Sequence, residues 1–294
     1  MTVDQALAEL RASVGGESAA ADARLLLAHV TGRDRAWLLA HGDETLEPAA
    51  LERARHLASR RAVGVPIAYL TNEAWFYGRR FEITRDVLVP RPETETLVAR
   101  ALDFLRARAP RSRDVPVQVC DVGTGSGIIA VTLACELPAL TVDAIDFSAA
   151  ALDVARRNAT LHDVDGIVRY AFGDAFEGMS PGAVFDCVVA NLPYVPAGEI
   201  PAAPNPLAHE PRPALDGGAD GLAVYRRLLK RLPHHLLPDG ALFAEAAPPT
   251  IAGLAALVRQ ALPDASVEIV RDAGGQDRLV AAVRGRAERE AATA

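Results

Sequence analysis

Four consecutive residues, Asn191, Leu192, Pro193 and Tyr194, carry groups that could hold a flat NH2 group for a reaction at its nitrogen. An amide or aromatic amine nitrogen is a poor nucleophile because its lone pair is delocalised, so a site must bind both N–H bonds and aim the lone pair. The side-chain oxygen of Asn191 offers one acceptor, and the backbone carbonyl of Leu192 offers the second. Pro193 would stiffen the loop, while Tyr194 offers a flat face for a planar target. The four residues therefore predict catalysis at such a nitrogen, although the same residue types also form ordinary turns.

A glycine-rich loop earlier in the chain could bind the second reactant. It reads Asp-Val-Gly-Thr-Gly-Ser-Gly over residues 121–127, where backbone N–H groups can meet a nucleotide-like ligand. A dinucleotide fingerprint needs a sixth-place glycine, which is Ile128 here, and Asp121 would repel phosphate but suit the amino group of a methionine moiety. The loop therefore favours S-adenosylmethionine over a pyrophosphate. The predicted binding residues are Asp121, Gly123, Thr124, Gly125, Ser126 and Gly127.

Acidic residues follow the next two predicted strands. Asp146 stands about twenty residues beyond the loop, where a carboxylate can accept hydrogen bonds from both hydroxyls of a ribose. Asp174 could accept from the exocyclic amine of adenine, with Ala175 flanking the ring. Each aspartate alone is as typical of a helix cap or a turn. Together with the glycine loop they predict a cofactor site, and we expect Asn191 to lie beside the transferred methyl group.

The elements that must position these residues alternate between strand and helix from residue 90 onward. Alternation of this kind builds a parallel sheet covered by helices on both faces. The last two strands are joined only by a glycine-containing turn, so we expect them to be antiparallel. By fold analogy this α/β, doubly wound sheet is the Rossmann-like arrangement of class I methyltransferases. The predicted strands are 117–122, 141–145, 167–172, 185–190, 241–245, 267–271 and 279–283, and the predicted helices include 128–135, 149–158 and 250–261.

The residues before the sheet predict a separate helical part. Apolar residues at helical spacing indicate four short helices between about residues 3 and 63. An aromatic, β-rich stretch from about 67 to 89, broken by Gly78, predicts a hairpin. We therefore expect a helical domain at 1–65, a β-hairpin linker at 66–89, a catalytic domain at 90–286 and a disordered tail at 287–294.

Composition limits the partners. The 294 residues carry a net charge of −7, which disfavours an affinity for nucleic acid based on broad phosphate neutralisation. Cys120, Cys135 and Cys187 lack metal-ligand spacing and each lies in an apolar run, so we expect no disulfide, no metal and a reducing cytoplasm. The first residues, Met1 to Leu10, carry charges and no apolar h-region, and no run of eighteen uncharged apolar residues occurs, so we expect neither secretion nor a membrane span.

With these residues in view, the chain resembles the protein-(glutamine) N-methyltransferases of the PrmC/HemK family over nearly its whole length. The resemblance rests on Pro66–Leu70, Val89–Glu95, the loop and aspartates above, Asn191–Tyr194 where the family has Asn-Pro-Pro-Tyr, and His209–Gly218. It implies that S-adenosylmethionine methylates the glutamine of the Gly-Gly-Gln motif in class I peptide chain release factors, and that the helical domain docks the release factor. It also implies that Arg91, Glu93 and Glu210 bind or orient the substrate, although a salt-bridge network that holds loops is an equal alternative.

Departures from the family pattern leave alternatives open. Leu192 replaces the first proline of the tetrapeptide, which would make the loop freer, and Glu245-Ala246-Ala247 replaces a pattern with glycine. A divergent paralogue with an altered target therefore stays open. So do an adenine-N6 methyltransferase acting on DNA or RNA and a cofactor-binding module without activity. The acidic chain and the lack of a target-recognition insertion disfavour nucleic acid, and we expect a monomer.

Overall fold

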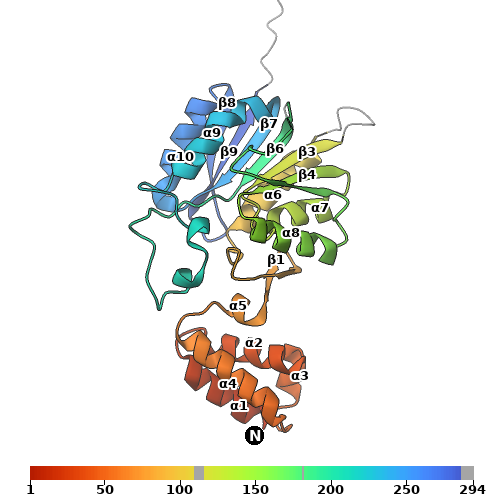
Figure 1. The fold of residues 1–294 in the computed structure, drawn as a ribbon, viewed down its shortest axis with the longest axis vertical. Helices are drawn as coiled ribbons and strands as arrows, with labels where there is room; N and C mark the ends of the chain where they lie inside the picture. The colour runs from red at the N-terminus through yellow and green to blue at the C-terminus, as the bar shows by residue number, and fades with distance from the viewer. Residues whose placement is uncertain (109–115, 181, 286–294) are drawn as a thin grey trace, which may run out of the picture. The chain divides into compact units, whose positions relative to one another are not determined.

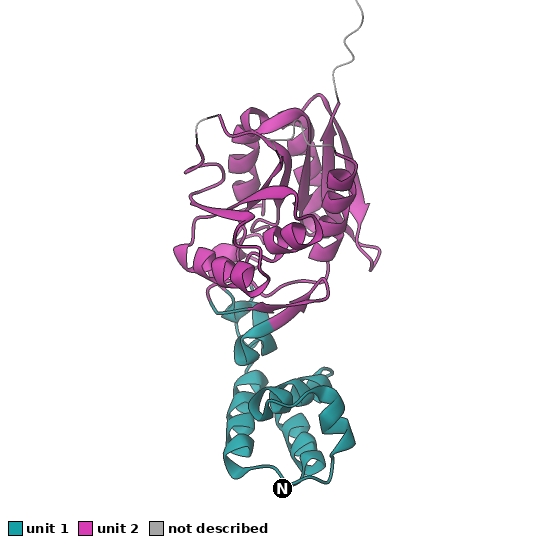
Figure 2. Cartoon of the chain, turned by 90° about the vertical axis from the view of Figure 1, so that its right-hand side faces the viewer, with its two compact units in different colours: residues 1–73, 83–85, 201–210 teal, residues 74–82, 86–200, 211–294 magenta. Residues whose placement is uncertain are grey.

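The computed structural model describes residues 1–108, 116–180 and 182–285 and divides the chain into two compact units. The first unit holds residues 1–73, 83–85 and 201–210, and the second holds the other described residues (Figure 2). The domain limits expected at 65 and 89 stay a prediction. The tail expected at 287–294 lies outside the described residues.

The first unit begins with four helices, which confirms the helical pattern predicted between residues 3 and 63. Thr2 and Gln5 form a capping box at the first helix, and Pro48 occupies the first turn of the fourth, where its missing N–H costs no hydrogen bond. The helices are α1 (Val3–Val14), α2 (Ala19–Thr31), α3 (Arg35–Ala40) and α4 (Pro48–Ala62).

A fifth helix, α5 (Ile67–Thr71), stands where the sequence predicts β structure, so that prediction is wrong for these residues. Four residues in a row, 68–71, are buried, which a half-exposed strand with alternating faces does not allow. The hydroxyl group of Thr71 donates to the carbonyl of Ile67 at 3.1 Å, and Asn72 ends the helix with a φ of 56°. Burial on all sides therefore decides the helical conformation of this apolar run.

The predicted hairpin follows α5. Its strands are β1 (Glu73–Phe76) and β2 (Arg79–Glu82). Tyr77 and Gly78, the two residues between the strands, have φ values of 51° and 73°. Two successive positive φ values give a turn whose twist matches that of paired strands, so the prediction of a hairpin at Gly78 is confirmed.

Seven strands of the second unit form one sheet in the order β5-β4-β3-β6-β7-β9-β8 (Figure 1). The first five are parallel, and β9 is antiparallel to both β7 and β8. The predicted doubly wound sheet with an antiparallel last strand is confirmed. The strands are β3 (Val117–Val122), β4 (Leu140–Asp146), β5 (Val168–Phe172), β6 (Phe185–Ala190), β7 (Leu236–Glu245), β8 (Ala265–Arg271) and β9 (Asp277–Arg284).

Helices cover both faces of this sheet. Neighbours α6, α7 and α8 pack in a row on one face, while α9 and α10 pack together on the other (Figure 1). All six residues of β6 are consequently buried, as expected for a central parallel strand. The helices are α6 (Thr94–Arg106), α7 (Ile128–Glu136), α8 (Ala149–Leu161), α9 (Ala223–His235) and α10 (Pro248–Ala261).

The register of the strands brings the predicted site residues to one edge. Val122 pairs with Ala190 and Ile145, and Ala190 also pairs with Ala244. From β3 the strands follow one another through β4 to β5 at one edge of the sheet, whereas from β6 they continue in the opposite direction to β7. The strand order therefore reverses between β3 and β6. Ligands of such sheets bind in the crevice at this reversal, outside the carboxyl ends of the strands.

The described residues carry few of the features that would suggest other classes of site. No helix in this part of the chain combines the length and the apolarity that crossing a bilayer requires. Within the same residues, no three His, Cys, Asp or Glu side chains gather as metal ligands would. Cys120, Cys135 and Cys187 are free thiols.

Candidate active site

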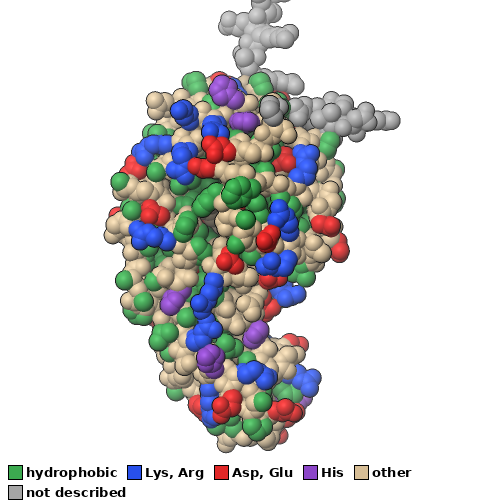
Figure 3. All heavy atoms as spheres, viewed as in Figure 1, with side chains coloured by type: hydrophobic (Ala, Val, Ile, Leu, Met, Phe, Trp, Pro, Cys, Tyr) green, Lys and Arg blue, Asp and Glu red, His purple; other side chains and the backbone are tan. Residues whose placement is uncertain are grey.

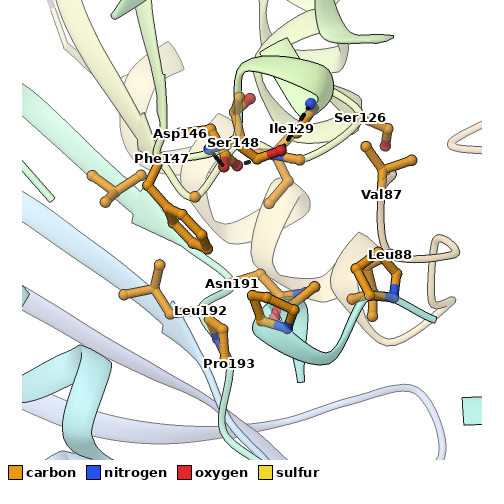
Figure 4. Close-up of a pocket in the computed structure, with 18 of the residues that line it drawn as sticks. Val87, Leu88, Ser126, Ile129, Asp146, Phe147, Ser148, Asn191, Leu192 and Pro193 are labelled. Carbon is orange, nitrogen blue, oxygen red and sulfur yellow. Dashed lines mark hydrogen bonds between the residues drawn. The ribbon is translucent and has the colours of Figure 1, made fainter. Parts of the chain in front are cut away.

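A cavity opens in the second unit at the carboxyl ends of β3, β4 and β6 (Figure 4). Eleven of the residues predicted from the sequence line it: Arg91, Gly123, Thr124, Gly125, Ser126, Asp146, Asp174, Ala175, Asn191, Leu192 and Pro193. Five others are not among the lining residues: Asp121, Gly127, Tyr194, Glu93 and Glu210. The structure therefore joins the glycine loop, two aspartates and most of the tetrapeptide in one cavity.

The glycine loop reaches the cavity through backbone conformations that suit glycine. Gly123, Gly125 and Gly127 all have positive φ, at 73°, 55° and 79°. A Cβ atom on Gly123 would lie 2.6 Å from Cδ2 of Leu192, so any side chain there would push against the tetrapeptide. The close approach of the two loops therefore depends on this glycine.

Asp121 stabilises the glycine loop through hydrogen bonds and is not among the residues that line the cavity. Its carboxylate Oδ2 accepts hydrogen bonds from the hydroxyl group of Thr124 at 2.7 Å and from the backbone N–H of Ala130 at 3.1 Å. The side chain is fully buried, and Oδ1 has no hydrogen-bond partner among the described residues. Burial raises the pKa of Asp121 to about 7, although both hydrogen bonds lower it. In this structure the carboxylate stabilises the loop, whereas the sequence suggested contact with a ligand.

The raised pKa of Asp121 predicts a pH-dependent stability. The folded protein binds this proton more tightly than the unfolded chain, so stability falls as pH rises towards 7 by about 1 kcal/mol per pH unit. Above pH 7 the contribution levels off, and in Asp121→Asn it is absent. Urea unfolding of the wild type and of Asp121→Asn should be measured from pH 5 to 8. The difference between their free energies of unfolding should change with pH up to about 7 and stay constant above it. Parallel stability curves would contradict the assignment.

Asp146 joins the glycine loop to the start of α8. Its Oδ2 accepts the N–H of Gly125 at 2.9 Å, and its Oδ1 accepts the N–H of Ser148 at 2.8 Å. Burial raises its pKa, while these backbone hydrogen bonds lower it. Each carboxylate oxygen has a second lone pair, so Asp146 can still accept from two hydroxyl groups in the cavity that it lines. This agrees with the geometry that a ribose diol needs.

Phe147 is a cavity residue that the sequence analysis missed. Its ring projects between the Asp146 side of the cavity and the side formed by Asn191, Leu192 and Pro193 (Figure 4). A large apolar ring left 48% exposed at such a position offers a flat surface to an adenine. Its place directly after Asp146 was the available signal. Asp174 also lines the cavity, and its carboxylate forms an ion pair with Arg227 at 2.6 Å.

The side chain of Asn191 is held in one direction. Its Nδ2 donates to the hydroxyl group of Thr94 at 3.1 Å, and Thr94 lies at the start of α6 with no exposed surface. Because the NH2 end of the carboxamide is occupied, Oδ1 is the end left for a ligand. Asn191 follows β6, next to the glycine loop that follows β3. The predicted acceptor therefore lines the cavity with its orientation already set.

The main chain at Leu192 is held by a second buried hydroxyl group. The N–H of Leu192 donates to Oη of Tyr225 at 3.2 Å, and the hydroxyl group of Tyr225 also contacts the backbone carbonyl of Glu245. The side chain of Leu192 is buried against Gly123. These contacts restrain the loop, so the freer loop expected from the missing proline is not what the structure has.

Leu192→Pro, which restores the residue of the family pattern, should lower stability rather than raise it. Proline has no N–H for Tyr225, and it fills less of the buried volume of leucine, so we expect a loss of about 1–3 kcal/mol. The carbonyl at 192 remains, and methyl transfer should fall by less than about tenfold. Urea unfolding and transfer rates check both parts. A variant more stable than the wild type would contradict the role of the Tyr225 contact.

The remaining predicted residues lie outside the cavity lining or at its margin. Tyr194 donates from its hydroxyl group to Oε1 of the buried Glu245 at 3.2 Å, and burial raises the pKa of Tyr194. Arg91 lines the cavity, whereas Glu93, the residue before α6, is not among the lining residues. Glu210 is buried and belongs to the first unit. The assigned substrate roles of Arg91, Glu93 and Glu210 stay predictions.

The lining residues fit S-adenosylmethionine. Gly123 and Gly125 line the cavity at the end of β3 without side chains, which lets a ligand approach the backbone there closely. Asp146 provides carboxylate acceptors for a ribose, and Phe147 provides the aromatic surface beside it. Asn191 and Leu192 face this group of residues across the same cavity (Figure 4).

Comparisons with known proteins identify relatives over most of the chain. Residues 2–71 match the family model "PrmC N-terminal domain", and residues 111–230 match the model "Methyltransferase small domain". A release factor glutamine methyltransferase from Bordetella pertussis is 44% identical over 82% of this chain and 86% of its own length. Proteins of the same name from Cereibacter sphaeroides and Bacillus subtilis are 40% and 37% identical over 92% and 89% of this chain, and over 93% and 90% of their own lengths.

The fold, the cavity and the methyltransferase match define an S-adenosylmethionine-dependent methyltransferase of the class I type. The sequence identity to the curated relatives, over most of each chain, also defines the family within this class. The chain belongs to the release factor glutamine methyltransferase family.

Proposed function

We propose that this chain transfers the methyl group of S-adenosylmethionine to the side-chain amide nitrogen of a glutamine in a peptide chain release factor. One observation carries the proposal. Asn191 has its NH2 end bound to Thr94, so its oxygen is free to accept from an amide N–H at the end of β6. The resemblance to the PrmC/HemK family implies that the target is the glutamine of the Gly-Gly-Gln motif.

The residues of the chain would act mainly by orientation. When bound, S-adenosylmethionine supplies an electrophilic methyl group on a sulfonium. Asn191 Oδ1 and the carbonyl of Leu192 accept the two N–H bonds of the glutamine amide, and this directs the nitrogen lone pair towards the methyl. The nitrogen would form a bond to the methyl carbon as the S–CH3 bond breaks, with S-adenosylhomocysteine as the leaving group, and would then lose one proton to water. Because that proton becomes acidic only after transfer, no base with a shifted pKa is required beforehand.

The partner class follows from the family rather than from charge alone. Acidic and basic side chains are interspersed on the face that Figure 3 shows, without the single basic field that phosphate binding favours. We propose that the helices of the first unit, which match the PrmC N-terminal domain, contact the release factor. We also propose that the chain acts as a monomer in the cytoplasm, where its three free thiols would stay reduced.

Methyl transfer from labelled S-adenosylmethionine tests the proposal. The acceptors are a purified release factor, the same factor with the Gly-Gly-Gln glutamine changed to alanine, duplex DNA, and RNA. We expect label only on the unmodified release factor, and mass spectrometry should place it on that glutamine. Label on nucleic acid would identify a base methyltransferase instead. Cofactor binding without transfer to any acceptor would identify a module that has lost its activity.

A further inference from the structure

Asn158 is a buried amide side chain in α8 that does not line the cavity. The residue is 0% exposed, and a buried polar group is costly unless it is hydrogen-bonded. Ala155 lies three residues earlier, on the same face of the helix. A Cβ atom on Gly127 would come within 3.0 Å of the Cβ atom of Ala155, so this face of α8 packs against the glycine loop.

The carboxamide of Asn158 binds the glycine loop through one of its groups. Its Nδ2 donates to the carbonyl of Ser126 at 2.9 Å. In a planar trans peptide the carbonyl and the next N–H point in opposite directions, and here the N–H of Gly127 donates to the carbonyl of Thr124 at 2.8 Å. The peptide between Ser126 and Gly127 is therefore held at both of its polar groups. Because Ser126 lines the cavity, this peptide lies at the cofactor site.

The same carboxamide also binds the β1–β2 hairpin. Its Nδ2 donates to the carbonyl of Glu82 at 2.9 Å, and its Oδ1 accepts the N–H of Glu82 at 2.7 Å. Both backbone groups of Glu82 are thus paired with one side chain, as they would be with an adjacent strand. Because an N–H can only donate and a carbonyl can only accept, these partners leave the carboxamide a single orientation.

Other contacts between the hairpin and α8 lie nearer to the surface. Arg157 forms an ion pair with the side chain of Glu82 at 2.8 Å, and both side chains are more than one third exposed, so this pair contributes little. Nε2 of His162 lies 2.8 Å from the carbonyl of Arg80. The hydrogen bonds of Asn158 are instead buried, where water does not compete for them. They give the hairpin a rigid connection to the glycine loop.

We propose that Asn158 is a positioning residue that fixes the glycine loop for S-adenosylmethionine and couples this loop to the β1–β2 hairpin. If the loop has its binding conformation in only a fraction of the molecules, the apparent affinity falls by that fraction. Coupling between two parts of a protein is reciprocal, so bound cofactor should also protect the hairpin. This role concerns cofactor binding and does not depend on which acceptor the enzyme methylates.

The first test measures the dissociation constant of S-adenosylmethionine by calorimetry in two variants. Asn158→Ala leaves the carbonyl of Ser126 without its donor, and we expect the dissociation constant to rise about 10-fold to 30-fold. Asn158→Asp keeps an acceptor for the N–H of Glu82 but has no donor for Ser126, so the rise should be at least as large. Asn158→Ser, whose hydroxyl group is too short to reach both partners, replaces Asn158→Ala if the alanine variant fails to fold.

Asp186→Asn is the matched control for a general loss of stability. Asp186 is 1% exposed and lies near the amino end of β6, whereas the cavity lies at the carboxyl ends of the strands. Its carboxylate accepts from Nε of Arg108 at 2.7 Å and from the N–H of Gln118 at 2.8 Å. The substitution should lower the midpoint of urea unfolding but change the cofactor dissociation constant by less than about twofold.

The second test acts on the hairpin and leaves Asn158 in place. Gly78 has a φ of 73°, and a Cβ atom there would meet nothing within 4 Å, so Gly78→Val strains only the backbone of the turn. We expect the cofactor dissociation constant to rise about threefold to tenfold. In Gly78→Val/Asn158→Ala the rise should exceed that of Asn158→Ala by less than about twofold, because the connection is already broken. Gly275→Val, at an equally open turn position with a φ of 79°, should leave the constant unchanged.

Hydrogen exchange measures the coupling from the other direction. Peptides that span residues 74–82 should exchange at least about fivefold more slowly when the wild type is saturated with S-adenosylhomocysteine. In Asn158→Ala, saturation should change this exchange by less than about twofold. The measurement needs no acceptor and no turnover.

Four results would overturn the inference. A wild-type dissociation constant in Asn158→Ala, or an equal rise in Asp186→Asn, would contradict the positioning role. Multiplicative losses in the double variant, or wild-type hairpin exchange that does not respond to the cofactor, would contradict the coupling. A wild type that shows every expected response but methylates no release factor would overturn the proposed function alone.

Discussion

Asn191→Ala is expected to lower the rate of methyl transfer by about 10²-fold to 10³-fold, the effect of removing one directed group from a reacting centre. The variant loses the oxygen that accepts one N–H of the target amide, so the nitrogen lone pair is no longer aimed. The glycine loop and Asp146, whose hydrogen bonds do not involve Asn191, remain in place. Affinity for S-adenosylmethionine should therefore change by less than about threefold.

Single-turnover rates with labelled cofactor and calorimetric titration measure the two parts separately. Asn191→Asp is the informative companion, because it keeps an acceptor oxygen but has no NH2 group for Thr94. We expect it to retain more activity than the alanine variant. If Asn191→Ala transferred methyl groups at the wild-type rate, the tetrapeptide would not be the site of the reaction.

Asp146→Ala is expected to show the opposite pattern, with a cofactor dissociation constant raised about 10²-fold. Two effects add. The variant loses the carboxylate acceptors for a ribose, and it also frees the N–H groups of Gly125 and Ser148, which loosens the loop that borders the cavity. At saturating S-adenosylmethionine, the transfer rate should recover much of its wild-type value.

Asp174→Ala is the control for this second variant. Asp174 also lines the cavity, but it already forms an ion pair with Arg227 and is partly exposed, so its removal should weaken binding by less than about tenfold. Equal dissociation constants for the Asp146 and Asn191 variants would contradict the separation of cofactor binding from catalysis.

Local sequence signals predicted the features that depend on neighbouring residues. The strand and helix periods, the hairpin at Gly78 and the glycine-rich loop all follow from chain geometry over a few residues. The same reasoning failed at α5, where Ile67–Thr71 were assigned to a β-rich stretch and form a helix with four buried residues in a row. Spacing alone also did not predict the hydrogen bonds of Asp121 to Thr124 and Ala130, because it does not reveal which way a side chain points, and the role of Asp121 in cofactor binding stays a prediction.

The parts of the site that sequence reasoning missed come from distant segments. Phe147 follows a predicted residue and could have been found from that position. Thr94 and Tyr225 could not, because their hydroxyl groups reach the tetrapeptide from helices 97 and 33 residues away in the chain. The contacts of Glu245 with Tyr194 and Tyr225 depend on the register between β6 and β7, which only the folded sheet defines.

A crystal structure of the protein with S-adenosylhomocysteine and a release factor tests the central claim most directly. The account predicts the Asn191 side-chain oxygen and the Leu192 carbonyl within about 3 Å of the glutamine amide nitrogen, with the cofactor sulfur in line behind it. A complex in which that nitrogen contacts neither oxygen, or in which the sulfur lies away from the end of β6, would contradict it.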